Sequence, residues 1–225
     1  MAISSRAFKD AIYDQLARIG KAVASPRRLE LLDLLCQAPR TVEELARRSG
    51  QSTANASHHL QVLRAARLVE TEKQGPFVRY SLADERVCEF YLSLRTLAGS
   101  RLAEVERVTR EYLESRGTME AIDRSTLLER VHTGRVTVID VRPVEEYEAG
   151  HIPGALCVPL EELEARLVEI PSSGEVVAYC RGPYCVLAVK AVLMLRKNGF
   201  TAVRLEDGVP DWHRRGLEVT TGREP

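Results

Sequence analysis

Cys180 and Cys185, five residues apart, are the one close pair among the cysteines of the sequence. The apolar run Val176–Tyr179 leads into the segment Cys180-Arg181-Gly182-Pro183-Tyr184-Cys185, and a helical pattern follows. A cysteine between a strand and a helix faces backbone N–H groups and the positive end of the helix dipole, which favour the thiolate. Because the thiolate is the nucleophile, this segment predicts covalent sulfur chemistry at Cys180.

The composition of the segment Cys180–Cys185 supports a tightly curled loop, which we call the thiol loop. Gly182 allows the backbone to curl closely, while Pro183 lacks an N–H and stiffens the turn. Such a loop can cradle a persulfide sulfur as well as a thiolate. The loop also contains a second thiol, that of Cys185.

The elements that must position the thiol loop alternate between strands and helices. Short β-branched runs at Val136–Val141, Val176–Tyr179 and Ala202–Leu205 are typical of buried parallel strands. The pattern over Val186–Asn198 predicts a helix that ends at Gly199. We therefore expect residues 118–225 to form an α/β domain with a central parallel sheet.

A second group of polar side chains has the pattern of a DNA-reading helix. From Ser52 to Arg64, one helical face is apolar, and the other carries short polar and basic groups of the kind that reach base edges and phosphates. Amides such as Asn55 and Gln61 suit adenine edges. The residues expected to contact DNA are Ser52, Thr53, Asn55, Ser57, His58, Gln61 and Arg64, with Lys73 and Arg79 flanking the turn of a hairpin. A solvated helix face without a ligand is the alternative.

The elements around this helix predict a winged helix-turn-helix, a mainly α fold with a small sheet. Ser25-Pro26 is typical of a helix start, and Thr41 with Glu44 forms a capping box that opens another helix. Alternating residues on both sides of Gly75-Pro76 predict a β-hairpin after the DNA-reading helix. Three helices and a hairpin in this order define the expected domain.

A long helical stretch follows from Asp84 to about Arg116, with more apolar surface than one small domain can cover. A dimer interface is the natural use of that surface, and packing against the second domain is the alternative. Because Gly117-Thr118 ends the stretch, we place the linker there. The expected domains are therefore residues 1–117 and 118–225.

Composition limits the classes of function. The chain of 225 residues is 44% hydrophobic and 28% charged, as is typical of globular proteins, and no apolar run is long enough for a membrane span. Charged residues interrupt the N-terminal segment, so we expect a cytoplasmic protein without a signal peptide or membrane partner. Residues 1–117 hold 19 Lys and Arg against 15 Asp and Glu, and the remainder holds 13 against 17. A basic first half is compatible with nucleic-acid binding.

The five cysteines are an odd number, and in a cytosolic protein they do not suggest a disulfide framework. We interpret Cys36 and Cys88 as buried, inert thiols. No CxxC pair or zinc-finger spacing occurs, so no metal or cofactor is expected.

Residues from about Ala24 to Leu82 resemble the ArsR family of winged-helix repressors. The resemblance rests on the segments Ala24–Leu32 and Ala54–Arg64 and on the hairpin. It implies a homodimer that binds a palindromic double-stranded operator and leaves it when an inducer acts. Metal-sensing members carry a Cys-x-Cys pair in the helix before the recognition helix, whereas this sequence has Val42-Glu43-Glu44-Leu45, so no metal site is expected there.

Residues from about Asp123 to Val219 resemble a single rhodanese domain. The matching segments are Asp140–Ala155, the thiol loop, and Leu205–Gly208 with Trp212 and Gly216. The resemblance implies that Cys180 accepts a sulfane sulfur, becomes a persulfide and transfers the sulfur to a nucleophile. Cys185 departs from the family pattern, and we hypothesise that it resolves the Cys180 persulfide into a disulfide or polysulfide link, which suits a sensor better than a turnover enzyme. It gives Asp140 and Arg142 a supporting role near the loop, while His151 and Trp212 are interpreted as structural. Related oxyanion-binding enzymes close a longer loop with an arginine, which Val186-Leu187 lacks.

Three functions fit these features. The leading interpretation is a repressor whose DNA affinity depends on the sulfur state of Cys180, with thiosulfate, polysulfide or a persulfide as the donor. The second is a sulfurtransferase whose winged helix anchors or autoregulates it, so enzymatic turnover stays open. The third is a sensor that binds trivalent arsenic or antimony through Cys180 and Cys185. A tight metalloid site needs three thiols, and only two are close in sequence.

Overall fold

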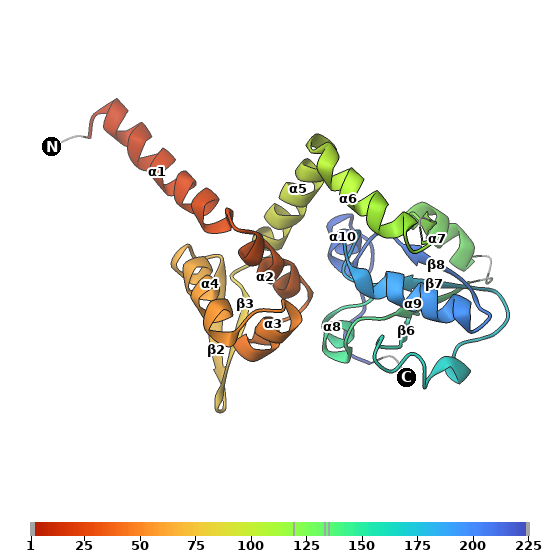
Figure 1. Cartoon of the computed structure of the whole chain (residues 1–225). Coiled ribbons are helices and arrows are strands. Elements are labelled where there is room, and N and C mark those ends of the chain that lie inside the picture. The colour runs from red at the N-terminus through yellow and green to blue at the C-terminus, as the bar shows by residue number, and fades with distance from the viewer. Residues whose placement is uncertain (1–2, 119, 133, 135, 224–225) are drawn as a thin grey trace. The chain divides into compact units, whose positions relative to one another are not determined.

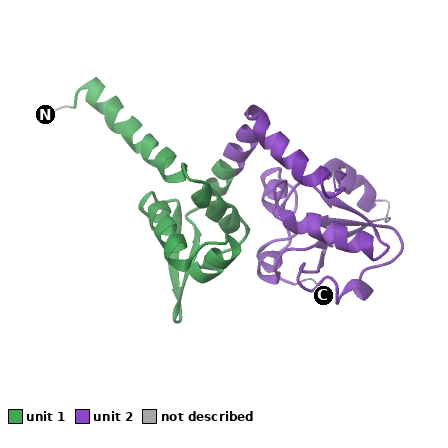
Figure 2. Ribbon diagram, viewed as in Figure 1, with its two compact units in different colours: residues 1–91 green, residues 92–225 purple. Residues whose placement is uncertain are grey.

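The computed structural model describes residues 3–118, 120–132, 134 and 136–223 (Figure 1). The chain divides into two compact units, residues 1–91 and 92–225 (Figure 2). The first is a winged helix and the second is an α/β unit with a parallel sheet, which confirms the predicted fold class. Among the described residues, no helix has the length and apolar character needed to cross a membrane.

The first unit follows the predicted order of helices and hairpin. Its elements are α1 (Ser5–Val23), α2 (Pro26–Gln37), β1 (Arg40–Thr41), α3 (Val42–Arg48), α4 (Thr53–Ala65), β2 (Val69–Gln74), β3 (Phe77–Leu82) and the beginning of α5 (Glu85–Arg101). The three strands form an antiparallel sheet in the order β1-β3-β2. Leucines of α2, α3 and α4, among them Leu31, Leu45 and Leu60, are fully buried and form the core beneath the sheet.

Local sequence signals explain how the helices of the first unit begin. Thr41 accepts a hydrogen bond from the Glu44 backbone N–H, and the Glu44 carboxylate accepts one from the Thr41 N–H, so the predicted capping box is present. Ser52 caps α4 by accepting from the Asn55 N–H at 3.2 Å. Ser25 occupies the cap of α2 with Pro26 after it, but its side chain makes no capping hydrogen bond.

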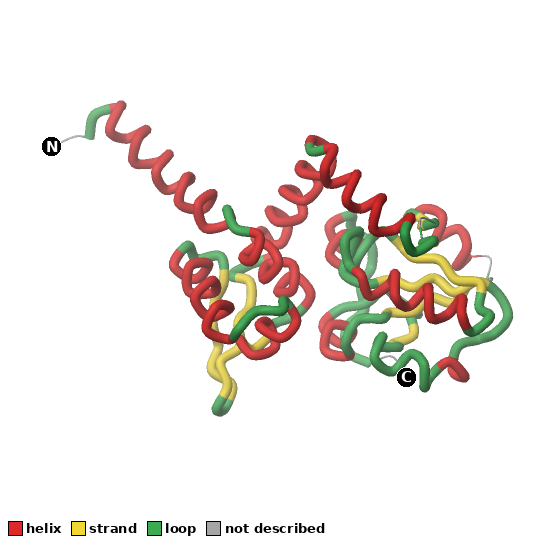
Figure 3. The backbone as a smooth tube through the Cα atoms, viewed as in Figure 1, coloured by secondary structure: helices red, strands yellow, loops and turns green. Residues whose placement is uncertain are grey.

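The second unit is a five-stranded parallel sheet with helices on both faces (Figure 3). After the end of α5 it contains α6 (Ala103–Glu114), β4 (Ala121–Ile122), α7 (Arg124–His132), β5 (Val136–Asp140), α8 (Val144–Ala149), β6 (Leu156–Cys157), the short 3-10 helix η1 (Leu167–Glu169), β7 (Glu175–Tyr179), α9 (Val186–Lys197), β8 (Thr201–Leu205) and α10 (Val209–Arg214). The strand order is β4-β8-β7-β5-β6.

Side-chain alternation along β7 divides the core of the second unit into two layers. Val176 and Ala178 face one layer, which includes the buried side of α9. Val177 and Tyr179 face the other, which includes Leu127 of α7 and Trp212 of α10. Since β7 is central and buried on both faces, its carboxyl end is held firmly at the edge where Cys180 follows.

The boundary between the units differs from the one predicted at residue 117. The expected long helix breaks at Leu102, where the backbone is extended, and this break separates α5 from α6. The end of α6 belongs to the second unit, because Leu113 is buried there and Arg196 donates to the Gly117 carbonyl at 2.9 Å. Residues 117–118 are therefore packed rather than a free linker. Leu113 of α6 is buried, whereas Val108 on the same helix is 57% exposed, so the use of this apolar surface stays a prediction.

The interpretation of Cys36 and Cys88 as inert thiols was wrong. The two residues form a disulfide between α2 and α5, with their Cα atoms 5.5 Å apart. Both positions are half-buried, and helix packing brings them together across 52 residues of sequence. Cys157, Cys180 and Cys185 are the free cysteines.

Candidate functional site

The thiol loop joins β7 to α9 at the carboxyl edge of the parallel sheet. Cys180 is only 2% exposed, and its thiol donates to the Cys185 carbonyl oxygen over 3.6 Å. The Cys185 N–H donates to the Gly182 carbonyl at 3.1 Å, which closes the turn, and Gly182 has a φ of +139° that favours glycine. Cys185 occupies the N-cap position of α9 and is half-buried.

An ion pair that the sequence analysis missed anchors the loop. The Arg181 guanidinium makes a bidentate contact with the Glu146 carboxylate of α8, with Nη2 2.7 Å from Oε1 and Nε 2.9 Å from Oε2. Glu146 is fully buried and the Arg181 side chain is 14% exposed. Glu146 stands within the segment Asp140–Ala155 that resembles rhodanese, but nothing in the sequence indicates that its partner is Arg181.

Asp140 and Arg142 lie at the end of the neighbouring strand β5 and are fully buried. Arg142 donates to Asp140 through Nε and Nη2, at 3.0 and 2.6 Å, and also donates to the Gly150 carbonyl at 2.7 Å. Although burial alone would lower the pKa of Arg142, the ion pair with Asp140 raises it above its ordinary value. These contacts fix both side chains at the end of β5, and their supporting role for the thiol loop stays a prediction.

Two further predicted structural residues are buried near this edge. His151 stacks on the Tyr147 ring with centroids 3.7 Å apart, and the Trp212 indole donates to the Glu218 carbonyl at 3.0 Å. Both side chains belong to the hydrogen-bonded interior of the second unit.

The two loop thiols ionise differently from the expectation that Cys180 is the thiolate. Burial raises the pKa of Cys180 well above its usual value, despite hydrogen bonds from the Ala188 and Gly182 backbone. A hydrogen bond from Cys180 lowers the pKa of Cys185 to about 7, even though burial opposes the shift, and the charge of Arg181 contributes. One negative charge is thus shared by two close thiols, and it resides first on Cys185.

Side chains from α5 and α10 press on the thiol loop from outside the matching segments. Arg95 of α5 forms an ion pair with Asp211 of α10, and both side chains are about one-tenth exposed. A Cβ atom at Gly182 would lie 2.9 Å from Arg95 Nη1. A Cβ atom at Gly208 would lie 2.3 Å from the Arg181 carbonyl carbon, so the loop backbone touches Gly208. Sequence reasoning missed Arg95, because 116 positions separate it from Asp211.

The predicted DNA-reading helix is α4, and it presents the expected side chains to solvent. Ala56, Leu60 and Leu63 are fully buried and fix the helix on its unit. The helix residues predicted to contact DNA are exposed or, for Ser57, half-exposed: Ser52, Thr53, Asn55, Ser57, His58, Gln61 and Arg64. Their exposure leaves them accessible to DNA, and their contact with bases stays a prediction.

The hairpin residues differ in their placement. Lys73 is exposed near the tip of the β2–β3 hairpin, where it pairs in register with Val78. Arg79 is half-buried and donates to the Pro39 carbonyl at 2.7 Å and to Gln74 Oε1 at 3.2 Å. Part of its guanidinium therefore stabilises the base of the hairpin.

No group of three or more His, Cys, Asp or Glu side chains able to hold a metal ion occurs among the residues that the structure describes. The thiol pair of the loop is thus without a third close thiol in that part of the chain.

A parallel α/β unit with a cysteine loop and a winged helix with an exposed reading helix define a regulator fused to a rhodanese-like unit. Residues 25–71 match the family model "Bacterial regulatory protein, arsR family", and residues 123–215 match "Rhodanese-like domain". The chain is 44% identical to the HTH-type transcriptional regulator Rv0324 of Mycobacterium tuberculosis, over 95% of this chain and 94% of that protein. It therefore belongs to the arsR family of transcriptional regulators, as a member with a rhodanese-like domain.

Other relatives match one unit each. A sulfurtransferase of Allochromatium vinosum is 34% identical over 44% of this chain and 92% of its own length. The solution structure of the homodimeric winged helix-turn-helix DNA-binding domain of Mb0332 from Mycobacterium bovis is 39% identical, covers 45% of this chain and 93% of that one, and has a TM-score of 0.42.

Proposed function

We propose that this transcriptional regulator binds its operator with an affinity that depends on the sulfur state of Cys180. The observation that carries the proposal is the position of Arg95. This side chain comes from α5, a helix that begins in the winged-helix unit and ends in the rhodanese-like unit, and it rests against Gly182 of the thiol loop.

A chemical change at Cys180 can affect α5 through the packing of the thiol loop. Cys180 is 2% exposed in a tightly packed loop, so the loop must move to make room for an added sulfur atom. The loop backbone touches Gly208 on one side and the Arg95–Asp211 pair on the other. Movement of the loop would therefore displace an ion pair that holds α5. A coupling of about 2 kcal/mol changes operator affinity roughly thirtyfold.

The test is an operator-binding assay with DNA from the region upstream of the gene, on wild type, Cys180→Ser and Cys157→Ser, with and without polysulfide. Cys157 is a free cysteine of the same unit and serves as the matched control. We expect polysulfide to change binding by wild type and Cys157→Ser and to leave Cys180→Ser unchanged. Equal responses in all three proteins would show that the Cys180 thiol does not control DNA binding.

We also propose a homodimer as the DNA-binding form. The α1 residues Phe8, Ile12 and Leu16 recur at helical spacing and are 46–59% exposed, so they leave an apolar stripe that a second copy can cover. Sedimentation of Leu16→Glu should show monomers under conditions where wild type is dimeric. Exposed Gln15→Glu is the control on the same helix.

Sulfur transfer is the second candidate, because the thiol loop itself has the parts that this chemistry needs. Cys180 accepts hydrogen bonds from backbone N–H groups, and a second thiol of low pKa lies beside it. Multiple turnovers of thiosulfate with cyanide as the acceptor would favour an enzyme. Uptake of a single sulfur atom without turnover would favour a sensor.

A further inference from the structure

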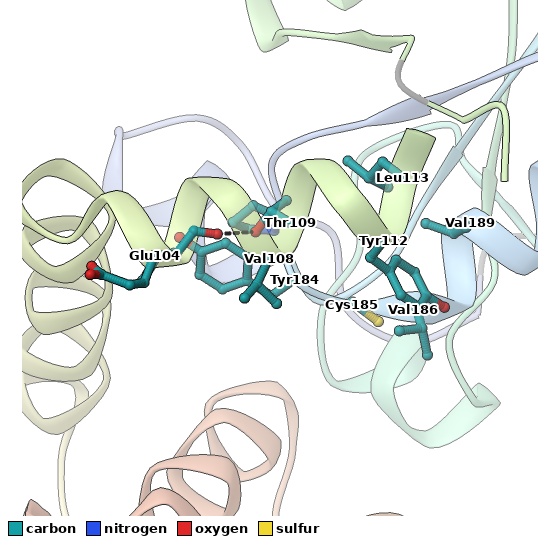
Figure 4. A pocket seen from close by; sticks show the side chains of 11 residues that line it. Glu104, Val108, Thr109, Tyr112, Leu113, Tyr184, Cys185, Val186 and Val189 are labelled. Carbon is teal, nitrogen blue, oxygen red and sulfur yellow. Dashed lines mark hydrogen bonds between the residues drawn. The ribbon is translucent and has the colours of Figure 1, made fainter. Parts of the chain in front are cut away.

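A cavity of about 500 Å³ lies within the second unit, between α6 and the beginning of α9 (Figure 4). Its α6 side includes Val108, Tyr112 and Leu113, and its opposite side includes Tyr184, Val186 and Val189. This volume is in the range of small-ligand sites. The cavity could not be predicted from the sequence, because residues 103–114 were expected to belong to the first domain.

The walls of the cavity are mostly apolar and favour a neutral ligand, and their polar side-chain groups are the hydroxyls of Thr109, Tyr112 and Tyr184, the Glu104 carboxylate and the Cys185 thiol. The hydroxyl of Thr109 already donates to the Val105 carbonyl at 2.8 Å, and the carboxylate of Glu104 stands at one exposed end (Figure 4). Among the residues that the structure describes, no lysine or arginine lines the cavity. Transfer of an anion such as thiosulfate into such a site would cost solvation energy without a compensating partner.

The cavity also contains a thiol. Cys185 is part of the lining and is half-buried, whereas Cys180 is 2% exposed and does not line the cavity. A ligand in the cavity therefore meets Cys185 first, and the Sγ of Cys180 lies within 3.6 Å of the Cys185 backbone.

We propose that this cavity binds a small organic persulfide, R–S–SH, in its neutral protonated form and with an apolar R group, and presents its outer sulfur to Cys185. The Cys185 thiolate attacks that sulfur, so a new S–S bond forms on Cys185. The donor S–S bond breaks, and R–S⁻ leaves with the electron pair. The inference deepens the proposed function, on which it rests, by naming the class of sulfur donor.

The test uses two thiosulfonates with the same reacting end, benzyl methanethiosulfonate and 2-sulfonatoethyl methanethiosulfonate. Each forms a mixed disulfide with a thiolate and releases methanesulfinate. Modification rates at Cys185 and at Cys157 are measured on the full chain by peptide mass spectrometry. Burial of a benzyl group in an apolar site favours binding by about tenfold or more. We expect the benzyl-to-sulfonatoethyl rate ratio to be about tenfold higher at Cys185 than at Cys157.

A second variant tests the cavity itself. Val108 is 57% exposed at the cavity wall, so Val108→Trp should fill the space without loss of folding. It should reduce the benzyl preference at Cys185, whereas Val168→Trp, at a position 93% exposed on η1, should not.

Two results would overturn the inference. One is an equal rate ratio at Cys185 and Cys157, and the other is a benzyl preference that Val108→Trp leaves intact. Neither result affects the operator assay with Cys180→Ser, because that assay uses inorganic polysulfide. Conversely, a polysulfide-insensitive regulator could still show the benzyl preference, so the two failures are distinguishable.

Discussion

Burial and hydrogen bonding decide which thiol of the loop ionises first. The N–H groups around the strand end, considered alone, favour the thiolate form of Cys180. In the folded unit, removal of Cys180 from water outweighs those groups and raises its pKa. Cys185 gains the hydrogen bond from Cys180 and the nearby charge of Arg181, and therefore carries the thiolate.

The rate of Cys185 alkylation should consequently rise with pH and level off above a midpoint near pH 7. In Cys180→Ala the largest cause of the lowered pKa is removed, so the midpoint should move to higher pH. Iodoacetamide labelling, followed by peptide mass spectrometry, measures both profiles. Cys157 is an internal control: burial raises its pKa to about 11, and its rate should still be rising where that of Cys185 is level. An unchanged midpoint in Cys180→Ala would contradict this account.

The ion pair between Glu146 and Arg181 gives a second prediction. Glu146→Gln removes the charge that holds a mostly buried guanidinium, and should lower the free energy of unfolding by about 3 kcal/mol. Urea unfolding can be followed by the fluorescence of Trp212, which is the single tryptophan of the chain and is buried in the second unit. Exposed Glu145→Gln on the same helix should change stability by less than about 0.5 kcal/mol.

At the scale of elements, local sequence signals predict the helices and strands well, whereas contacts between residues distant in sequence are not predicted. The capping box of Thr41, the strand Val136–Asp140 and the helix after Cys185 follow from patterns within a few residues, and the structure has them. The break at Leu102 follows Gly99-Ser100, a local signal that the apolar periodicity of the stretch outweighed in the prediction of one long helix. The close approach of Arg95 to Gly182 of the thiol loop depends on packing between segments that are remote in sequence.

Gly208 illustrates such a packing constraint. Its φ of −101° suits any residue, but an added Cβ would collide with the Arg181 backbone. Gly208→Ala should therefore lower the free energy of unfolding by about 1–3 kcal/mol, as overpacking does. Trp212 fluorescence during urea unfolding measures the loss, and Glu206→Ala at an exposed neighbouring position provides the reference. Wild-type stability in Gly208→Ala would show that the backbone of the thiol loop can move away from residue 208 at little cost in free energy.

At the scale of the molecule, the disulfide between Cys36 and Cys88 joins the first unit across a long stretch of sequence. The oxidised, denatured chain should expose three titratable thiols, those of Cys157, Cys180 and Cys185, and the reduced chain five. Because the bond closes a loop of about 50 residues, reduction should destabilise the first unit by roughly 4 kcal/mol. Thermal unfolding followed by circular dichroism, with and without reductant, checks this value. A count of five thiols before reduction would show that the disulfide between Cys36 and Cys88 is absent.

The position of α6 also has a consequence for the modular history of such chains. The segment that matches a rhodanese-like domain begins at residue 123, yet the second compact unit begins at residue 92. A recombination junction between these two points would detach Arg95 from Asp211 and remove one wall of the cavity beside Cys185. An exchange of rhodanese-like domains between regulators at the family boundary would therefore separate the thiol loop from Arg95 and from the α6 wall of the cavity.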